Sequence, residues 1–137
     1  KQEGKTDSER ILYYLVDLVN KRQSSLKRTL TEEERFAVID EMVKDMAVGN
    51  KLNLLLFDGE IMYAHTNYKN SLYCLQTENA AYFSTAPLSL EAWEPVKMTA
   101  LAAYKEGKLI SRGKSHGGEY VDDPENMNLI FIDYSGL

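Results

Sequence analysis

The chain has 137 residues, 44% of them hydrophobic and 27% charged, which is the balance of a folded globular domain and not of a disordered chain. Its formal net charge of −5 argues against a surface built to neutralise phosphates, so we do not expect a nucleic-acid partner. No window approaches the roughly 20 apolar residues that span a bilayer, and the first ten residues do not resemble a signal peptide, so we expect a soluble, cytoplasmic protein with no membrane partner.

The first predicted element is an amphipathic helix that begins at Thr6-Asp7-Ser8-Glu9. A threonine hydroxyl at a helix start accepts a hydrogen bond from a backbone N–H one turn later, and Glu9 can reach back to Thr6. Apolar residues then recur at three- and four-residue spacing up to about Lys21, which predicts a stripe that faces a sheet. The stripe comprises Ile11, Leu12, Leu15, Val16 and Val19.

A second helix is predicted to begin at Thr31, where Thr31-Glu32-Glu33-Glu34 repeats the starting signal, and to end before Gly49, which favours a left-handed stop. Its apolar stripe comprises Phe36, Ile39, Val43 and Met46. The stretch between the two helices carries four basic residues directly followed by three glutamates. Because these charges largely cancel, we interpret the stretch as a solvated connection.

From residue 51 onward the pattern changes to that of β-strands. Residues 52–57 form a short apolar run, Asp58-Gly59 is a turn signal, and Ile61, Tyr63 and His65 alternate in the next strand, which together predict a hairpin. Further strands are predicted at residues 72–76, 81–85, 99–104, 108–112 and 129–134, with residues 106–107 as a turn. Residues 115–128 are polar and contain two glycines, so we expect a loop or a mobile excursion there.

Helices in residues 1–50 and mostly antiparallel strands in residues 51–137 predict an α+β fold in which the helices cover one sheet face. Because residues 52–57 are apolar on both sides of the pleat, the central strand should be covered on both faces. The chain offers helices for only one of them. We therefore expect the second layer to come from outside this chain, and the first residue, Lys1 in place of Met, also leads us to expect a segment upstream.

Without further comparison, the residues say little about a reaction. The sequence contains no glycine-rich phosphate loop, no pair of cysteines and no two histidines at metal-ligand spacing. Cys74 stands alone and is expected to be a small buried residue and not a nucleophile. The two histidines lie in unrelated contexts, His65 in a strand as a packed or rim side chain and His116 beside a Gly-Gly loop.

Three segments, in order, resemble the class II glutamine amidotransferases, the N-terminal-nucleophile hydrolases that release ammonia from glutamine. They are residues 4–9 (Gly-Lys-Thr-Asp-Ser-Glu), residues 54–60 (Leu-Leu-Leu-Phe-Asp-Gly-Glu), and residues 81–88 (Ala-Tyr-Phe-Ser-Thr-Ala-Pro-Leu) with 93–96 (Trp-Glu-Pro-Val). The resemblance spans about residues 4–112. It implies that residues 1–137 are the C-terminal portion of one such domain, half of a four-layer αββα sandwich.

The resemblance also implies that the catalytic machinery is only partly present. In the family the nucleophile is an N-terminal cysteine whose own α-amino group acts as the base, and it would lie upstream of Lys1. The groups that grip the glutamine carboxylate and stabilise the oxyanion would lie upstream as well. We therefore assign no catalytic residue in this chain, and we expect it to be inactive without the upstream half of the domain.

Asp7 is the one site residue that the resemblance carries onto this chain. In the family the aspartate of this segment binds the α-ammonium group of glutamine, and a helix start would hold such a carboxylate rigid. Helix dipoles also favour acids in the first turn, so Asp7 has a purely structural interpretation too. The expected substrate is glutamine or a related γ-glutamyl small molecule, with the ammonia acceptor undetermined.

Two other interpretations remain open. One is a non-catalytic α+β interaction module that is completed by a partner chain. The other is a metal-dependent hydrolase around four possible cation ligands, His116, Glu119, Asp122 and Asp123. Because acids in a glycine-containing loop are usually solvated, we expect no metal and no cofactor.

Overall fold

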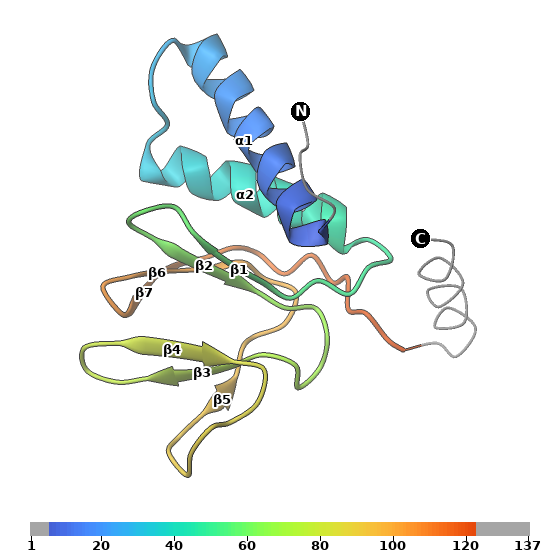
Figure 1. The fold of residues 1–137 in the computed structure, drawn as a ribbon, viewed down its shortest axis with the longest axis vertical. Helices are drawn as coiled ribbons and strands as arrows, with labels where there is room; N and C mark the ends of the chain where they lie inside the picture. Colours follow the sequence, from blue (N-terminus) through green and yellow to red (C-terminus); the bar gives the residue numbers. More distant parts are fainter. Residues whose placement is uncertain (1–5, 123–137) are drawn as a thin grey trace.

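The described chain forms three layers. A computed structural model describes residues 6–122 and shows two helices over a four-stranded sheet, with a three-stranded sheet beneath it (Figure 1). The elements are α1 (Asp7–Leu26), α2 (Glu32–Ala47), β1 (Leu54–Phe57), β2 (Met62–His65), β3 (Tyr73–Gln76), β4 (Ala81–Ser84), β5 (Glu94–Pro95), β6 (Ala102–Lys105) and β7 (Lys108–Arg112). The α+β prediction is confirmed, while the strand predicted at 129–134 lies outside the described residues.

Both helices begin at the predicted threonines. The Thr6 hydroxyl accepts a hydrogen bond from the Glu9 backbone N–H (3.3 Å), which fixes the start of α1. At Thr31 the capping box is complete, because the Thr31 hydroxyl accepts from the Glu34 N–H (3.2 Å) and the Glu34 carboxylate accepts from the Thr31 N–H (3.1 Å). Each start is therefore set by local sequence alone.

The end of α1 was predicted wrongly. The helix continues past Lys21 to Leu26, where Lys27 adopts a left-handed conformation (φ 57°) and donates its N–H to the Gln23 carbonyl. The Gln23 side chain also accepts from the backbone N–H of the buried Leu30 (3.2 Å). The connection between the helices is thus five residues shorter than expected, because a side-chain contact and a non-glycine cap extend the helix.

All strand pairs in the described chain are antiparallel. The four-stranded sheet has the order β1-β2-β6-β7 and the three-stranded sheet the order β4-β3-β5. The predicted β1–β2 hairpin is confirmed, with Gly59 at φ 102° in its turn. Gly107 turns β6 into β7 at φ 78°, and a Cβ there would lie 2.6 Å from the Ala80 Cα. Only glycine therefore lets the two sheets approach at this point.

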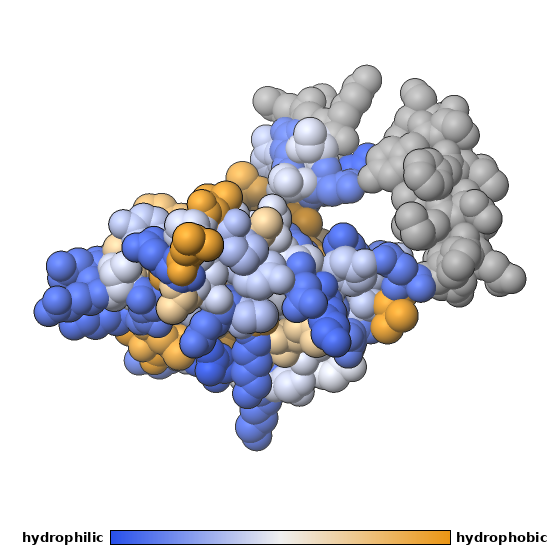
Figure 2. Space-filling view, turned by 90° about the horizontal axis from the view of Figure 1, so that it is seen from below, coloured by the Kyte–Doolittle hydropathy of each residue, from blue (hydrophilic) through white to orange (hydrophobic). Residues whose placement is uncertain are grey.

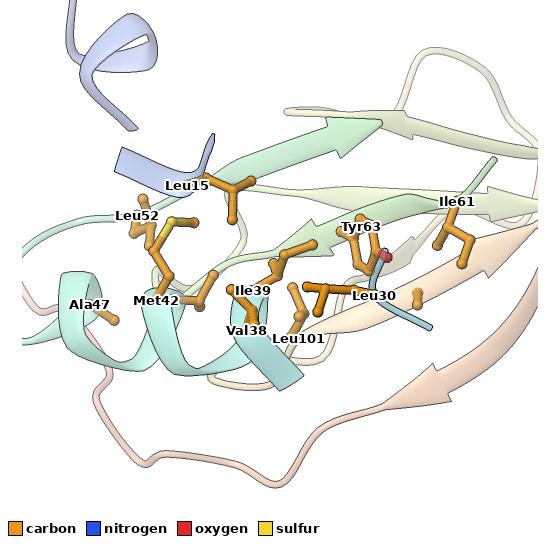
Figure 3. Close-up of a cluster of buried hydrophobic side chains, with 12 residues drawn as sticks. Leu15, Leu30, Val38, Ile39, Met42, Ala47, Leu52, Ile61, Tyr63 and Leu101 are labelled. Atoms are coloured by element: carbon orange, nitrogen blue, oxygen red, sulfur yellow. The ribbon is translucent and has the colours of Figure 1, made fainter. Parts of the chain in front are cut away.

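The main core lies between the helices and the four-stranded sheet (Figure 3). Its centre is formed by Met42 and Val43 of α2 against Tyr63 of β2 and Leu101, all no more than 1% exposed. Each such side chain contributes about 1.5–3 kcal/mol on burial. α1 contributes less than its sequence suggested: Leu15 is buried, but Leu12 and Val16 of the predicted stripe are 49% and 45% exposed.

The opposite face of the four-stranded sheet is partly covered by the chain itself, which corrects the prediction that this layer comes from outside. Ala64, Ala102 and Tyr104 pack against the three-stranded sheet, with the Phe83 ring 5.1 Å from the Tyr104 ring. The physical reason is that β3 and β4 fold beneath β2 and β6 as a second sheet and do not extend the first. At β1 this cover is missing, and Phe57 is 60% exposed.

Seen from the side of the three-stranded sheet, the surface is mainly hydrophilic and its apolar residues gather in separate patches (Figure 2).

The short strand β5, which pairs with β3 through Tyr73 and Cys74, was not predicted because two residues ending in proline carry no strand pattern. Among residues 6–122, neither helix is apolar enough over a sufficient length to cross a membrane.

Candidate functional site

Asp7 occupies the first position of α1 with its side chain exposed to solvent. The Thr6 cap fixes the backbone on one side, and the helix that follows is anchored in the core by Leu15. No hydrogen bond or ion pair joins the Asp7 carboxylate to another residue within 6–122. The carboxylate is thus held on a rigid element and faces solvent, which suits a group that receives a cationic ligand.

A second polar region, which the sequence did not predict, lies where β2 ends. His65, Thr66 and Asn67 follow one another and are all no more than 1% exposed, a burial that polar side chains tolerate only when they are hydrogen-bonded. The alternation of Ile61, Tyr63 and His65 did place the histidine on the buried face. Nothing in the sequence indicated which groups it would meet there.

Asn67 joins three parts of the chain through one side chain. Its Oδ1 accepts from the Leu52 N–H (2.8 Å), and its Nδ2 donates to the carbonyls of Asn50 (2.7 Å) and Gly118 (3.1 Å). Its own carbonyl accepts from the Tyr120 N–H (2.7 Å). The segment after β7 is therefore fastened to the segment before β1. Within residues 115–122 the predicted loop is confirmed, and hydrogen bonds hold it in place.

The two histidines meet, although the sequence placed them in unrelated contexts. His65 Nε2 lies 3.0 Å from His116 Nε2, and His65 Nδ1 lies 3.0 Å from the Leu52 carbonyl oxygen. Burial, together with the neighbouring His116, lowers the pKa of His65 to about 4. Burial also lowers the pKa of His116. Both rings are therefore neutral at pH 7.

The possible cation ligands near His116 do not come together in the described chain. Asp122 instead accepts a hydrogen bond from the Tyr68 hydroxyl, whose ring lies beneath the Lys51 ammonium at 4.0 Å. Asp123 lies outside the described residues. Within 6–122, no three His, Cys, Asp or Glu side chains are close enough to share a metal ion.

Cys74 lies half-buried on β3, between the two sheets. Burial raises the pKa of its thiol, which keeps it protonated. A nucleophilic cysteine needs the opposite shift, because the thiolate is the reactive form. The environment of Cys74 therefore matches the expected packing role.

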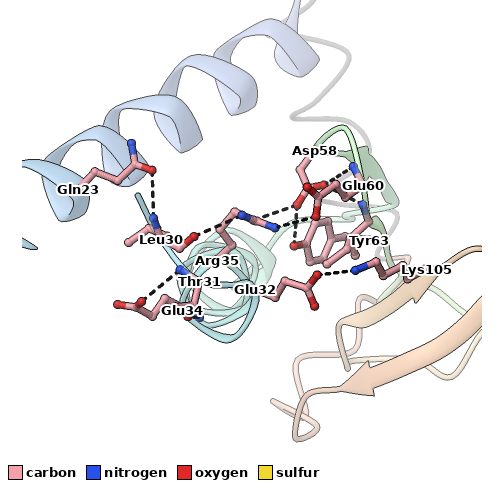
Figure 4. Close-up of polar contacts among 11 residues, drawn as sticks. Gln23, Leu30, Thr31, Glu32, Glu34, Arg35, Asp58, Glu60, Tyr63 and Lys105 are labelled. Carbon is pink, nitrogen blue, oxygen red and sulfur yellow. Dashed lines mark hydrogen bonds and ion pairs between the residues drawn. The ribbon is translucent and has the colours of Figure 1, made fainter. Parts of the chain in front are cut away.

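Opposite the His65 end, the β1–β2 turn is held by a charged network (Figure 4). Asp58 Oδ2 accepts from Arg35 Nε (3.1 Å) and from the Tyr63 hydroxyl (3.0 Å), while Oδ1 accepts from the backbone N–H groups of Glu60 and Ile61. Burial alone would raise the pKa of Asp58, but these hydrogen bonds and the Arg35 charge lower it. Burial and the Asp58 contact raise the pKa of Tyr63 to about 12. The Asp58 carboxylate and the Tyr63 hydroxyl are both satisfied within the protein, so the role of this network is structural.

An apolar hollow of about 320 Å³ opens between α1 and β1. Its apolar lining comprises Leu12, Leu15, Val16, Val19, Ile39, Leu56 and Phe57. Three of these side chains, Leu12, Val16 and Phe57, are 45–60% exposed. The hollow thus adjoins the part of the sheet that the second layer leaves uncovered.

A comparison with protein families matches residues 2–80 to the family described as glutamine amidotransferases class-II. The match covers more than half of the 137 residues and includes Asp7, both helices, the β1–β2 hairpin and β3. Searches of curated proteins and of solved structures found no match.

Proposed function

The chain belongs to the class II glutamine amidotransferases, and we propose that it forms the C-terminal portion of a domain that releases ammonia from glutamine. The observation that carries the proposal is the family match across the Thr6-Asp7-Ser8-Glu9 segment, together with the exposed carboxylate that the structure holds there. Asp7 binds the α-ammonium group of glutamine or of a related γ-glutamyl compound. The carboxylate and the ammonium group carry opposite charges and can form a charge-assisted hydrogen bond, and the fixed helix start holds the carboxylate in position.

The nucleophile of the proposed reaction is an N-terminal cysteine upstream of Lys1, whose α-amino group takes the thiol proton. Attack of the thiolate on the glutamine amide carbon then expels ammonia and leaves a thioester, which water hydrolyses. In this division of labour, residues 1–137 position the substrate through Asp7 and supply no group to bond making. The chain alone is therefore inactive.

The upstream half of the domain packs against β1 in this proposal. β1 lies at the edge of its sheet, with no described strand on its outer side, and alternate residues Leu55 and Phe57 are 46% and 60% exposed. An open edge beside exposed apolar side chains favours pairing with another strand. The apolar hollow between α1 and β1 continues this surface, so the upstream half completes the sandwich there.

The test is the substitution Asp7→Asn in the full-length protein, with glutamine hydrolysis measured as ammonia release. We expect kcat/KM for glutamine to fall by about two orders of magnitude, because a hydrogen bond to a charged group contributes about 1.5–3 kcal/mol. The urea unfolding midpoint should stay nearly unchanged, since Asp7 is exposed. Asp17→Asn is the matched control, because it removes the same charge from an exposed position of the same helix.

Equal kinetics for Asp7→Asn and Asp17→Asn would remove Asp7 from the site.

The division between the two halves has its own test, in which residues 1–137 and the upstream half are produced separately and mixed. We expect activity only in the mixture. Activity in residues 1–137 alone would overturn the assignment of the nucleophile to the upstream half.

A further inference from the structure

The His65–His116 contact has a hydrogen-bond pattern that permits only one pair of tautomers. The Leu52 carbonyl can only accept, so His65 Nδ1 carries a proton and donates to it (3.0 Å). The Gly118 N–H can only donate, and it donates to His116 Nδ1 (3.0 Å), so the proton of His116 is on Nε2. His116 Nε2 then donates to the bare His65 Nε2 at 3.0 Å.

In this arrangement all four ring nitrogens are satisfied while both rings are neutral. An added proton on His65 would sit on Nε2 and point at the Nε2–H of His116. An added proton on His116 would sit on Nδ1 and point at the Gly118 N–H. A proton on His65 thus places two donors opposite each other and breaks the His65–His116 contact, whereas a proton on His116 breaks only the Gly118 hydrogen bond within the segment.

The contact fastens the segment that follows β7 to the ends of β1 and β2. Three backbone N–H groups of this segment donate to the rest of the chain: Gly113 to the Leu101 carbonyl (2.8 Å), His116 to the Thr99 carbonyl (2.9 Å) and Tyr120 to the Asn67 carbonyl (2.7 Å). The Gly118 carbonyl also accepts from Asn67 Nδ2 (3.1 Å). The histidine pair is the only contact among these whose donors and acceptors change with mild acid.

We propose that the His65–His116 hydrogen bond is a pH-sensitive latch, which holds residues 113–122 against the ends of β1 and β2 while His65 is neutral and releases them when His65 gains a proton. The latch does not rest on the proposed glutamine site. It concerns the stability of one segment, and it operates whatever the chain binds.

The charged groups that act on the two rings come from α2. Asp40 favours a proton on both rings, whereas Lys44, which is paired with Asp40 at 2.9 Å, disfavours one on His116. β1, in which Leu54 pairs with His65, carries no charged side chain, and in β6 Tyr104 lies on the opposite sheet face while Lys105 pairs with Glu32. Burial outweighs the Asp40 charge, so the pKa of His65 falls to about 4 from 6.5.

A lowered histidine pKa fixes the direction of the pH response. The released segment binds more protons than the latched one, so the latched state is fully favoured above pH 6.5 and weakens as the pH falls from 6.5 towards about 4. Within that window, uptake of one proton on release changes the ratio of released to latched segment by about tenfold for each pH unit.

Two facing imidazoles are also a common pair of metal ligands, so a metal site is the alternative to the hydrogen bond. A metal on both Nε2 atoms would require both to be unprotonated, whereas the Gly118 N–H on His116 Nδ1 leaves the proton of that ring on Nε2. A third ligand for such an ion is also missing among residues 6–122. The structure therefore favours the hydrogen bond.

The first test uses the fact that the chain has only two histidines, so imidazole ¹⁵N spectra of the full chain are unambiguous. We expect at pH 7.5 one ring protonated on Nδ1, His65, and one protonated on Nε2, His116, with no change on adding one equivalent of Zn²⁺. Two rings with the same tautomer and independent, ordinary titrations would overturn the latch. Zinc-induced shifts of both Nε2 signals would overturn it in favour of a metal site.

The second test measures hydrogen exchange of the Tyr120 amide between pH 7.5 and 5, with the Val96 amide as the internal reference because it bonds to Leu72 outside the segment (2.9 Å). After correction for intrinsic exchange rates, the Tyr120 amide should lose protection by about tenfold per pH unit below 6.5. His116→Gln should abolish this pH dependence, because the glutamine amide can turn its oxygen towards a protonated His65.

Tyr68→Phe is the control for the second test. It removes the Tyr68 contact to Asp122 on the same segment and leaves the histidine pair intact, so it should lower Tyr120 protection at every pH without changing the slope. Equal slopes for the wild-type chain and His116→Gln would contradict the latch.

Discussion

The two ends of the β1–β2 hairpin are stabilised by opposite means. At the turn, the ionised Asp58 carboxylate binds Arg35 and the Tyr63 hydroxyl, and the Arg35 and Asp58 side chains keep 26% and 17% of their surface exposed. At the open end, the neutral side chains of His65 and Asn67 are fully buried. Charge is thus used where water still reaches the groups, and neutral hydrogen bonds where it does not.

This difference follows from the cost of desolvation. Burying an ion pair costs several kcal/mol per ion, and its attraction compensates only when the geometry is good and the remaining polar atoms are satisfied. Neutral polar groups are much less costly to bury once each has a hydrogen-bond partner. The hairpin therefore has one end that is sensitive to charge removal and one end that is sensitive to loss of a single hydrogen-bonding atom.

The two ends also respond to acid in different windows. The lowered pKa of Asp58 means that its stabilisation is present above its unfolded pKa, about 3.9, and is lost as the pH falls through its folded pKa. The lowered pKa of His65 weakens the open end already between pH 6.5 and about 4. Mild acid should therefore loosen the open end while the turn stays intact.

The largest effect on this comparison should come from Asn67→Ala at the open end. The substitution leaves the buried Leu52 N–H and the partly buried Asn50 and Gly118 carbonyls without their partner, and an unsatisfied buried group costs about 1–3 kcal/mol. We expect a loss of at least about 3 kcal/mol in the free energy of unfolding, measured by urea denaturation at pH 7.

Asn50→Ala is the matched control for Asn67→Ala. The Asn50 side chain is exposed and donates only to the Met46 and Val48 carbonyls, so water can replace it. We expect a loss below about 1 kcal/mol. If Asn50→Ala and Asn67→Ala were equally destabilising, the buried amide would not be what joins the segments.

A smaller effect, about 1–2 kcal/mol at pH 7, is expected for Asp58→Asn at the turn. The amide keeps an acceptor for the backbone N–H groups but loses the ion pair with Arg35. Because this variant has no carboxylate to protonate, its additional loss of stability below pH 4 should also disappear. Glu60→Gln, which removes the exposed carboxylate 3.8 Å from Arg35, should change stability by less than about 0.5 kcal/mol.

How far the sequence predicts the fold depends on whether the cause is local. Thr6 and Thr31 begin their helices as predicted because a cap needs only residues within one turn. The β1–β2 hairpin is predicted because Asp58-Gly59 sets its turn. The second sheet could not be predicted, since its position depends on packing of Phe83 against Tyr104 and on the close approach of Gly107 to Ala80.

The candidate site divides in the same way. Asp7 was found through a short segment with a family resemblance, and its exposure at a helix start agrees with the local signal. The histidine pair could not be found, because its partners are 51 positions apart and meet only when the segment after β7 returns to the end of β2. The one local sign is the polar run His65 to Asn67 at the end of an alternating strand, because buried polar side chains need hydrogen-bond partners.

Apart from the control variants, the smallest effect is expected for Tyr63→Phe, which removes one hydroxyl from the charged end. The ring stays in the core, where Tyr63 is fully buried, and only the hydrogen bond to Asp58 (3.0 Å) is lost. We expect a cost of about 1 kcal/mol by urea denaturation at pH 7, the typical value for one hydrogen bond. The pKa of Asp58, followed by its carboxyl ¹³C shift, should rise because the hydroxyl no longer stabilises the ionised form. A stability loss above about 3 kcal/mol would instead show that the hydroxyl, and not the Arg35 charge, holds the turn against α2.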